Sequence, residues 1–566
     1  MKLTALVTVA AVSALLPGVA AAQRAKSPAE ATVFIRLIGS AHAEFEEFGI
    51  KRTLDVDRLE IATGSGFVIS PFGYVLTNAH VVENGDPVRF KGRGTVTFRV
   101  SSINVCFGPE AAAARGQASA CAEASVTASD ADLDLAVLFV GGSSNLPYLP
   151  FGDSDVIAPG LAVDALGYPF GRDVEIGRVA TAPDLVPDVS TTPGAISALR
   201  SNDAGERRYL QITNSVNPGN SGGPVVTREG FAVGVIHSRL VKASAIGFAI
   251  PINEVKNLLD SHGLDHVMPT RRLRLGVFQN LDPKGLGLRL PEGYTDRSPF
   301  MSRVESDPAA GEIALRVDRV VSPWTARRLE ETLVSTQTFE PLTMTPRAGK
   351  EAPRPAVPGL LLGGAAGTGT DPDQEIRMDH AVLDLGAEKL VARYVGAAEA
   401  MAFNEGVLRE SLGSLQGQRF AAAALPAPEK MTWSTVPDAT GRGVLPVPAG
   451  WVLEPGRPSP CGGLPAPRLV ASAFPLHDST IVLRAAVWSG GVAPDAAASS
   501  CSSRRGSLGA ASYATTLSWL GVPYVIEGAF ARVGASDLVQ LEILATEPQS
   551  ALARALLVIW QKKATE

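Results

Sequence analysis

The residues best suited to catalysis lie in a short glycine-rich stretch around Ser221. This octapeptide reads Asn-Pro-Gly-Asn-Ser-Gly-Gly-Pro over residues 217–224. Glycines let the backbone turn tightly and bring its N–H groups beside the serine hydroxyl. Such N–H groups can stabilise the oxyanion that forms when a hydroxyl attacks a carbonyl. The stretch therefore favours acyl-transfer chemistry over the simpler interpretation as a glycine-rich hairpin loop.

A serine hydroxyl is a weak nucleophile, so it needs a base and a carboxylate that orients the base. His80 follows the segment Tyr-Val-Leu-Thr-Asn-Ala, at the end of an expected strand. Asp132 and Asp134 both lie close before the run Leu-Ala-Val-Leu, and strand alternation would place them on the same face. The order His, Asp, Ser is that of chymotrypsin-like folds, not of subtilisins or α/β-hydrolases.

With these residues in place, the chain from about residue 31 to 257 resembles the protease domain of the HtrA/DegP group of trypsin-like serine proteases. The resemblance implies a mainly β fold with two six-stranded antiparallel β-barrels, and no cofactor or metal. It is carried by six stretches in the right order: residues 64–67, 74–82, 134–138, 167–171, 211–224 and 247–251.

The resemblance also implies roles for individual residues. Ser221 would attack the scissile carbonyl and His80 would act as the base. Among the two aspartates, the match selects Asp134, which directly precedes Leu-Ala-Val-Leu, as the carboxylate that orients His80. Gly219, Asn220 and Ser221 would form the oxyanion hole, with the N–H groups of Gly219 and Ser221 as donors.

Val216, His237 and Ser238 are the candidate residues of the substrate pocket. Proteases of the HtrA group usually prefer small aliphatic residues before the cut. Glutamyl endopeptidases, distant relatives with this fold, use a histidine at the position of His237 to meet an acidic side chain. Val216 occupies the place of their hydroxyl donor, so a carboxylate here would lack partners and be costly to desolvate. We therefore expect cleavage after Val, Ala or similar residues, with His237 as a polar spacer beside the pocket.

The N-terminus predicts export. Lys2, the apolar residues 3–16 and the small residues 20–22 form a signal-peptide pattern over residues 1–22. The apolar run is too short to span a bilayer, so no integral membrane segment is expected after cleavage. We predict a periplasmic or secreted protein.

The four cysteines fit that compartment. Four cysteines allow three pairings. We favour the local one, Cys106 with Cys121 and Cys461 with Cys501, because each pair then lies inside one expected domain. Neither pair has the spacing of metal ligands.

At 566 residues the chain predicts several domains. After the signal peptide we expect a protease domain over 23–265, a PDZ-like α/β module over 266–350, a Pro/Gly/Ala-rich linker over 351–375 and a C-terminal α+β domain over 376–566. Within these parts, residues 39–57 are interpreted as an acidic, helical insertion and residues 379–409 as helical.

These observations predict an exported serine endopeptidase that cleaves unfolded or misassembled proteins, with protein or peptide substrates. The resemblance also implies homo-oligomers. A net charge of −6 offers no basic surface for nucleic acid. The alternatives are a dedicated processing protease for one exported substrate and a chaperone or binding protein on a protease scaffold. The complete His, Asp, Ser set argues against the scaffold alternative.

Overall fold

The structure is a computed structural model in which the described residues form two compact units. The N-terminal unit contains the residues up to Arg272 together with Ala402–Gly406, and the C-terminal unit contains the rest. The described ranges are 24–47, 50–83, 87–90, 94–116, 119–143, 145–169, 186–201, 207–237, 246–281, 286–296, 302–305, 313–321, 324–333, 343–347, 359–368, 375–386, 388–417, 427–437, 443–449, 451–454, 469–474, 481–489, 493–501, 505–506, 509–519, 522–533, 537–546 and 550–565.

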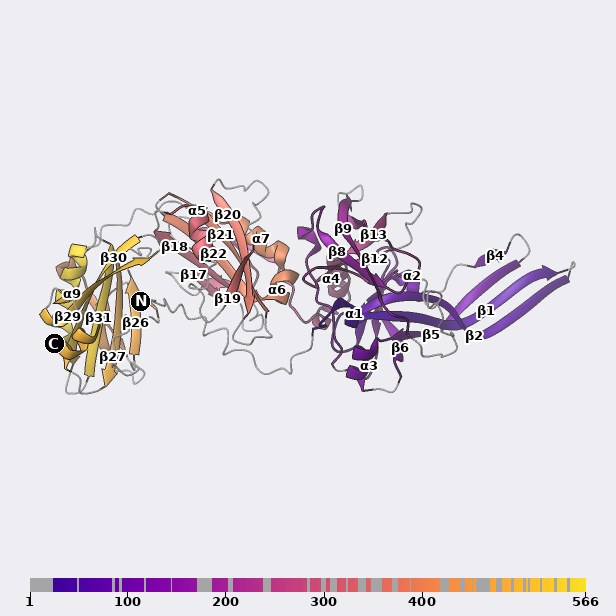
Figure 1. The fold of residues 1–566 in the computed structure, drawn as a ribbon, viewed down its shortest axis with the longest axis horizontal. Helices are drawn as coiled ribbons and strands as arrows, with labels where there is room; N and C mark the ends of the chain where they lie inside the picture. Colours follow the sequence, from indigo (N-terminus) through magenta and orange to yellow (C-terminus); the bar gives the residue numbers. More distant parts are fainter. Residues whose placement is uncertain are drawn as a thin grey trace. The chain divides into compact units, whose positions relative to one another are not determined.

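Two closed β-barrels make up the N-terminal unit and confirm the predicted mainly β, trypsin-like fold (Figure 1). In the first barrel, pairing of β1 with β5 closes six strands, and β4 extends the sheet at its edge. Its strands are β1 (Thr32–Glu47), β2 (Ile50–Val68), β3 (Tyr74–Thr77), β4 (Val88–Phe90), β5 (Gly94–Cys106), β6 (Cys121–Asp130) and β7 (Leu135–Phe139).

The second barrel has six strands in the order β10-β13-β12-β11-β8-β9. Short apolar runs such as Ala-Val-Gly-Val-Ile in β12 are buried along their whole length, as expected for strands inside a barrel core. The strands are β8 (Ala162–Gly167), β9 (Ser190–Ser201), β10 (Arg207–Ile212), β11 (Pro224–Thr227), β12 (Ala232–Ile236) and β13 (Gly247–Pro251).

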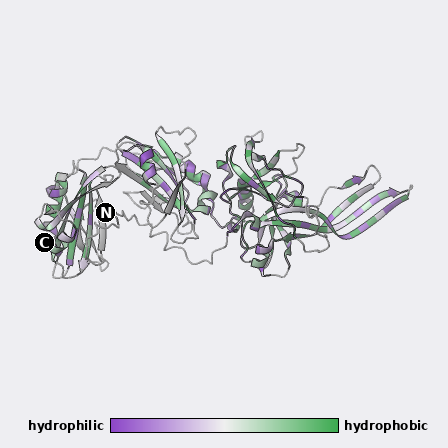
Figure 2. Ribbon diagram, in the orientation of Figure 1, coloured by the Kyte–Doolittle hydropathy of each residue, from purple (hydrophilic) through white to green (hydrophobic). Residues whose placement is uncertain are grey.

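The helical insertion predicted over 39–57 is wrong. The described residues of this stretch, 39–47 and 50–57, continue β1 and β2, which pair with each other and, through β1, with β5, and extend from the barrel (Figure 1). We call this extension the arm. One face of it is apolar, because Ala43 lies between Leu54 and Val96 across the strands, whereas His42 and Asp55 pair on the other face. Figure 2 shows the resulting alternation of hydrophilic and hydrophobic residues along these strands. Period-two alternation of this kind is a strand signal, and the acidic residues obscured it.

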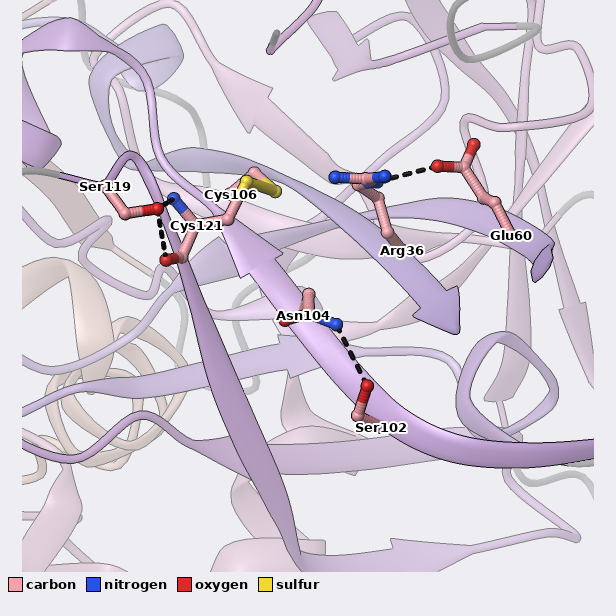
Figure 3. Close-up of a disulfide and its surroundings, with 7 residues drawn as sticks. All are labelled: Arg36, Glu60, Ser102, Asn104, Cys106, Ser119 and Cys121. Atoms are coloured by element: carbon pink, nitrogen blue, oxygen red, sulfur yellow. Dashed lines mark hydrogen bonds and ion pairs between the residues drawn. A yellow bond between two sulfur atoms is a disulfide. The ribbon is translucent and has the colours of Figure 1, made fainter. Parts of the chain in front are cut away.

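A disulfide joins Cys106 at the end of β5 to Cys121 at the start of β6, as predicted (Figure 3). It closes the loop that contains the short helix α3 (Pro109–Arg115). Beside it, Ser119 hydrogen-bonds to the backbone of Cys121, and Arg36 pairs with Glu60 at 2.7 Å (Figure 3). Cys501 is also disulfide-bonded. Cys461 lies outside the described residues, so its pairing with Cys501 stays a prediction.

Helix α4 (Ile252–Ser261) follows the last barrel strand, where the sequence predicts a closing helix. Its Lys256 is fully buried and donates a 2.7 Å hydrogen bond to the carbonyl of Phe403. Ala402–Gly406, which we call the return segment, therefore belongs to the N-terminal unit although the predicted protease domain ended at residue 265. Two shorter helices, α1 (Pro28–Ala31) and α2 (Ala79–Val82), complete this unit together with the 3₁₀ turns 154–156 and 265–267.

The C-terminal unit is β-rich, consistent with PDZ-like modules, but its boundaries differ from those predicted. Residues 360–368, inside the predicted linker, form a strand of a seven-stranded sheet, next to its edge strand. The Gly/Ala-rich composition suggested a linker, yet Leu360 and Ala365 are buried in the sheet. Likewise, much of 379–409 is strand, and helix begins only at Ala398.

That seven-stranded sheet has the order β16-β17-β18-β22-β21-β20-β19. A second sheet later in the chain has the same arrangement, β25-β26-β27-β31-β30-β29-β28. The first is built from β16 (Thr295–Asp296), β17 (Ser302–Glu305), β18 (Ile313–Val321), β19 (Thr343–Arg347), β20 (Leu360–Thr368), β21 (Glu375–Asp384) and β22 (Glu388–Ala397), with α5 (Ala326–Leu333), α6 (Ala398–Phe403) and α7 (Glu405–Gly413). The second is built from β25 (Val452–Glu454), β26 (Leu469–Phe474), β27 (Ile481–Ser489), β28 (Arg505–Gly506), β29 (Gly509–Trp519), β30 (Val522–Val533) and β31 (Asp537–Thr546), with α8 (Pro494–Cys501) and α9 (Ser550–Thr565). Two hairpins stand apart from these sheets, β14 (Leu275–Asn280) with β15 (Gly287–Pro291) and β23 (Trp433–Pro437) with β24 (Gly443–Pro448).

The two sheets fill one equivalent position in opposite ways. In the first sheet, His380 of β21 faces Gly363 of β20. In the second, Gly528 of β30 faces Tyr513 of β29. A Cβ atom on either glycine would lie within 2.5 Å of the opposing ring. In each sheet a large side chain from the neighbouring strand therefore occupies the space beside the glycine, and beside Gly363 the carboxylate of Glu330 is also close.

Among the described residues, no helix has the length and apolar character needed to cross a membrane.

Candidate active site

His80 lies at the start of α2, directly after β3, and three hydrogen bonds orient it on Asp134. Its Nδ1 is 2.7 Å from Oδ2 and 3.0 Å from Oδ1 of the carboxylate. Its backbone N–H donates to Oδ1 at 2.9 Å. The amide of Asn78 donates to the carbonyl of Asp134 at 2.8 Å. The segment that directly follows β3 therefore contains His80 and also holds the aspartate that orients it.

Asp134 rather than Asp132 meets His80. Asp132 is exposed, and its backbone N–H donates to the side chain of Asp130 in the turn before β7. Asp134 is buried and has φ +57°, in the left-handed region. Aspartate tolerates this conformation better than most residues. The tight turn points its carboxylate back toward His80.

The environment keeps Asp134 ionised. Burial alone would raise its pKa, but hydrogen bonds from His237 and His80 outweigh burial and hold the pKa well below its usual range. An ionised carboxylate only accepts hydrogen bonds. His80 must therefore carry its proton on Nδ1, which leaves Nε2 as a base.

The loop that bears Ser221 packs against β2 and the end of β3. The backbone N–H of Ser65, in β2, donates to the carbonyl of Ser221 at 2.9 Å. Gly222 has φ +84°, and a Cβ there would lie 2.2 Å from the carbonyl oxygen of Ser65 and 2.3 Å from Oγ1 of Thr77. Only glycine allows this approach. The structure thus holds the loop that carries Ser221 against Ser65 and Thr77 of the first barrel, the barrel that also carries His80 and Asp134.

Ser65 also fixes the predicted oxyanion hole. Its hydroxyl donates to the carbonyl of Gly219 at 2.6 Å and accepts from the backbone N–H of Tyr168 at 2.9 Å. The Gly219 carbonyl is thereby held against β2. Ser65 lies in one of the stretches that match the family, but its role could not be predicted because its partners lie more than 100 residues away.

The backbone N–H of Asn220 has a partner inside the loop. That N–H donates to the carbonyl of Asn217 at 3.0 Å inside the loop. The carbonyl of Asn220 accepts from Gly223. The assignment of Gly219, Asn220 and Ser221 to an oxyanion hole stays a prediction.

His237 is placed differently from the expected spacer beside the pocket. Its side chain is buried, with 7% exposure, and its Nδ1 is 2.7 Å from Oδ2 of Asp134. Its ring stacks on Tyr209 of β10 with centroids 5.5 Å apart. The imidazole is therefore directed at the same carboxylate as His80.

The other predicted pocket residues are less informative. Val216 is 9% exposed and packs in the core of the second barrel, where a Cβ on Gly247 would approach it to 3.0 Å. Ser238 lies outside the described residues.

Among the described residues, His80, Asp134 and His237 form one group whose metal-ligand type atoms lie within 4.8 Å of one another. Hydrogen bonds account for this proximity, because each Nδ1 lies 2.7 Å from the carboxylate. The Nδ1–H group of each imidazole donates to the carboxylate, so all three side chains have hydrogen-bond partners within the group.

Known proteins that resemble this chain are serine proteases. Residues 64–235 match the model of the trypsin-like peptidase domain family. A relative described as a putative serine protease HhoB from Synechocystis is 30% identical over 328 residues, which is 55% of this chain and 69% of that protein. A probable periplasmic serine endoprotease, DegP-like, from Halomonas elongata is 31% identical over 45% of this chain and 47% of its own length. A solved serine endoprotease from Yersinia pestis shares 25% identity over 44% of this chain and 67% of its own, with a TM-score of 0.27.

Proposed function

Since the chain belongs to the HtrA/DegP group of trypsin-like serine proteases and is a serine endopeptidase, we propose that it is exported and cleaves unfolded or misassembled proteins. The observation that carries the catalytic assignment is the 2.7 Å hydrogen bond between His80 and Asp134, beside a loop that presents Ser221. The export pattern of residues 1–22 and the Cys106–Cys121 disulfide support an oxidising compartment such as the periplasm.

In this mechanism Ser221 attacks the scissile carbonyl while Nε2 of His80 accepts its proton. The carboxylate of Asp134 stabilises the imidazolium that forms. The N–H groups of Gly219 and Ser221 bind the oxyanion, an interaction that typically contributes about 10²- to 10³-fold in rate per donor. His80 then returns the proton to the leaving amine.

For substrate choice we propose an apolar pocket that accepts small aliphatic side chains before the cut. Val216 presents an apolar side chain near the loop, and His237 is engaged by Asp134. A substrate carboxylate would find neither a hydroxyl at Val216 nor a free Nδ1 on His237, so its desolvation would be uncompensated.

The test is hydrolysis of unfolded casein by the full chain. Ser221→Ala and Asp134→Asn should each lower the rate by about 10⁴-fold. Asp132→Asn is the matched control: it removes an aspartate charge two residues away in the sequence and should keep most of the activity. Cleavage retained by Ser221→Ala, or a larger loss in Asp132→Asn than in Asp134→Asn, would refute these assignments.

The physiological role needs a second measurement. In cells that carry Ser221→Ala, a quality-control enzyme should leave many exported proteins uncleaved. Accumulation of a single precursor would instead identify a dedicated processing protease, which is the alternative that the sequence left open.

A further inference from the structure

The carboxylate of Asp134 faces two imidazoles rather than one. Oδ2 lies 2.7 Å from Nδ1 of His80 and 2.7 Å from Nδ1 of His237. Side-chain exposures of 19% for His80, 9% for Asp134 and 7% for His237 leave little room for water to replace either donor. One oxygen atom therefore takes two charge-assisted hydrogen bonds, which are the stronger kind.

The ionised carboxylate fixes the tautomer of both rings. Because it can only accept, each Nδ1 carries a proton when the site is at rest. His80 is then ready to act through Nε2. His237 donates to the second lone pair of Oδ2. Without this hydrogen bond, the carboxylate could rotate toward another donor.

The backbone and the ring of His237 are both fixed. Its N–H donates to the carbonyl of Phe248 at 2.9 Å, which ties it to β13. Its ring lies nearly parallel to Tyr209, at 19°, and edge-on to His80, with centroids 6.2 Å apart. Among the described residues the titratable groups that face it are Asp134, His80 and Tyr209.

The position of Asp134 makes such support necessary. A non-glycine residue with φ +57° is in a sparsely populated conformation, which persists only where its surroundings determine it. Its carbonyl is held by Asn78 and Oδ1 by the backbone of His80. Only Oδ2 depends on side chains alone, and His237 is one of the two.

We propose that His237 is a positioning residue of the triad: it donates from Nδ1 to Oδ2 of Asp134, holds the carboxylate in place and shares its charge with His80. This inference rests on the proposed function. It assigns to His237 a role in aligning the base, instead of contact with the substrate. Because His237 directly follows β12, which borders the predicted pocket, it also links that wall to the triad.

Two variants separate the hydrogen bond from the ring. His237→Asn keeps an N–H donor close to the position of Nδ1 but loses the ring, whereas His237→Phe keeps the stack on Tyr209 but loses the donor. We expect His237→Asn to retain kcat within about threefold. We expect His237→Phe to lose about tenfold or more in kcat with KM changed less than threefold, since a loss of positioning affects the transition state.

The pH dependence of kcat/KM distinguishes positioning from a merely structural role. Without the second donor, the carboxylate interacts more strongly with His80, so the acidic limb of the profile should move to higher pH in His237→Phe and stay in place in His237→Asn. An unchanged limb in His237→Phe, or a change confined to KM, would overturn the proposal.

An NMR measurement does not depend on activity, so it tests the proposal even if the wild type hydrolyses no substrate or a variant folds poorly. In the full chain with Ser221→Ala, imidazole ¹⁵N–¹H NMR should show two Nδ1–H protons shifted downfield by the carboxylate. Adding Asp134→Asn should shift both back. A single shifted proton in Ser221→Ala would contradict the proposal, whatever the enzyme cleaves.

Discussion

At the residue scale, the hydroxyl of Ser65 holds the catalytic loop from the opposite barrel. It is completely buried and bridges the Gly219 carbonyl and the Tyr168 N–H. Removing it leaves two buried polar groups without partners, which typically costs about 1–3 kcal/mol for each group. The peptide that precedes Asn220 then loses the contact that sets its orientation.

Ser65→Ala should therefore lower kcat by about 10²-fold, in the range seen when one oxyanion-hole donor is lost, while KM changes little. Steady-state kinetics on a reporter peptide measure this. Ser197→Ala is the control, because Ser197 also donates to a backbone carbonyl in the second barrel, at 3.1 Å, but away from the loop. An active Ser65→Ala enzyme would show that the loop keeps its geometry without this bond.

The triad itself could be predicted from the sequence because acyl transfer restricts both the residue types and their neighbours. The glycines around Ser221 and the strand before His80 follow from the geometry of the reaction. The partner of His237 could not be predicted, since Asp134 is 103 residues away and no local pattern fixes the direction of a side chain. The same holds for Ser65 and Gly219, which are 154 residues apart.

At the scale of elements, the buried amine of Lys256 in helix α4 bonds to the return segment. Burial lowers the pKa of Lys256 to about 7. Its ammonium group contacts the carbonyl of Phe403 at 2.7 Å and lies 4.0 Å from the centre of the Phe403 ring. Asp153 anchors the same segment, because its carboxylate accepts from the N–H of Gly406 at 2.8 Å.

This shift predicts how stability depends on pH. An unfolded lysine titrates near 10.4, so between about pH 7 and pH 10 the unfolded chain binds a proton that the folded chain lacks. The free energy of unfolding of the N-terminal unit should therefore rise with pH across this window, by at most about 1.4 kcal/mol per pH unit. Below pH 7 Lys256 should add no further slope.

Pulse proteolysis in urea, in a Ser221→Ala background that prevents self-cleavage, measures this free energy. Lys256→Met removes the titrating group with little change in volume, so the difference between the two proteins isolates the contribution of Lys256. A wild-type slope equal to that of Lys256→Met over this window would mean that the amine keeps its usual pKa.

Some strands were harder to predict than the triad, because their amino-acid composition is not typical of strands although they pair with neighbouring strands in the sheet. The Leu-Leu-Leu-Gly-Gly-Ala-Ala-Gly-Thr of β20 contains almost no β-branched residues, and strands β21 and β22 are rich in Ala and charged residues. Their tertiary partners decide their structure, because each is hydrogen-bonded on both sides in the sheet. Strand propensity is weak against such context.

At the scale of the whole molecule, the return segment makes the N-terminal unit depend on residues far along the chain. Phe403 packs in the core of this unit, stacked on Phe151 with centroids 6.4 Å apart. A chain that ends at Arg272 lacks this contact and leaves Lys256 without its acceptor. A chain that ends at Gly417 keeps both.

We expect the chain ending at Arg272 to be less stable in its N-terminal unit by about 3 kcal/mol or more, the usual cost of removing a buried phenylalanine. The chain ending at Gly417 should match the full-length protein in the same urea experiment. Equal stability of the two truncated chains would show that the return segment contributes nothing to the barrels. Phe403→Ala in the full chain should reproduce most of the loss.

The opposite filling of the two seven-stranded sheets bears on how the chain avoids misassembly. Sheets with the same strand order could exchange strands while the chain folds, which is a known failure of repeated domains. If β29 paired with β21, Tyr513 and His380 would have to occupy the same space. If β20 paired with β30, Gly363 would face Gly528 and leave a hole. Each wrong pairing would therefore either overcrowd this position or leave it empty. The large and small residues thus favour the correct strand pairing.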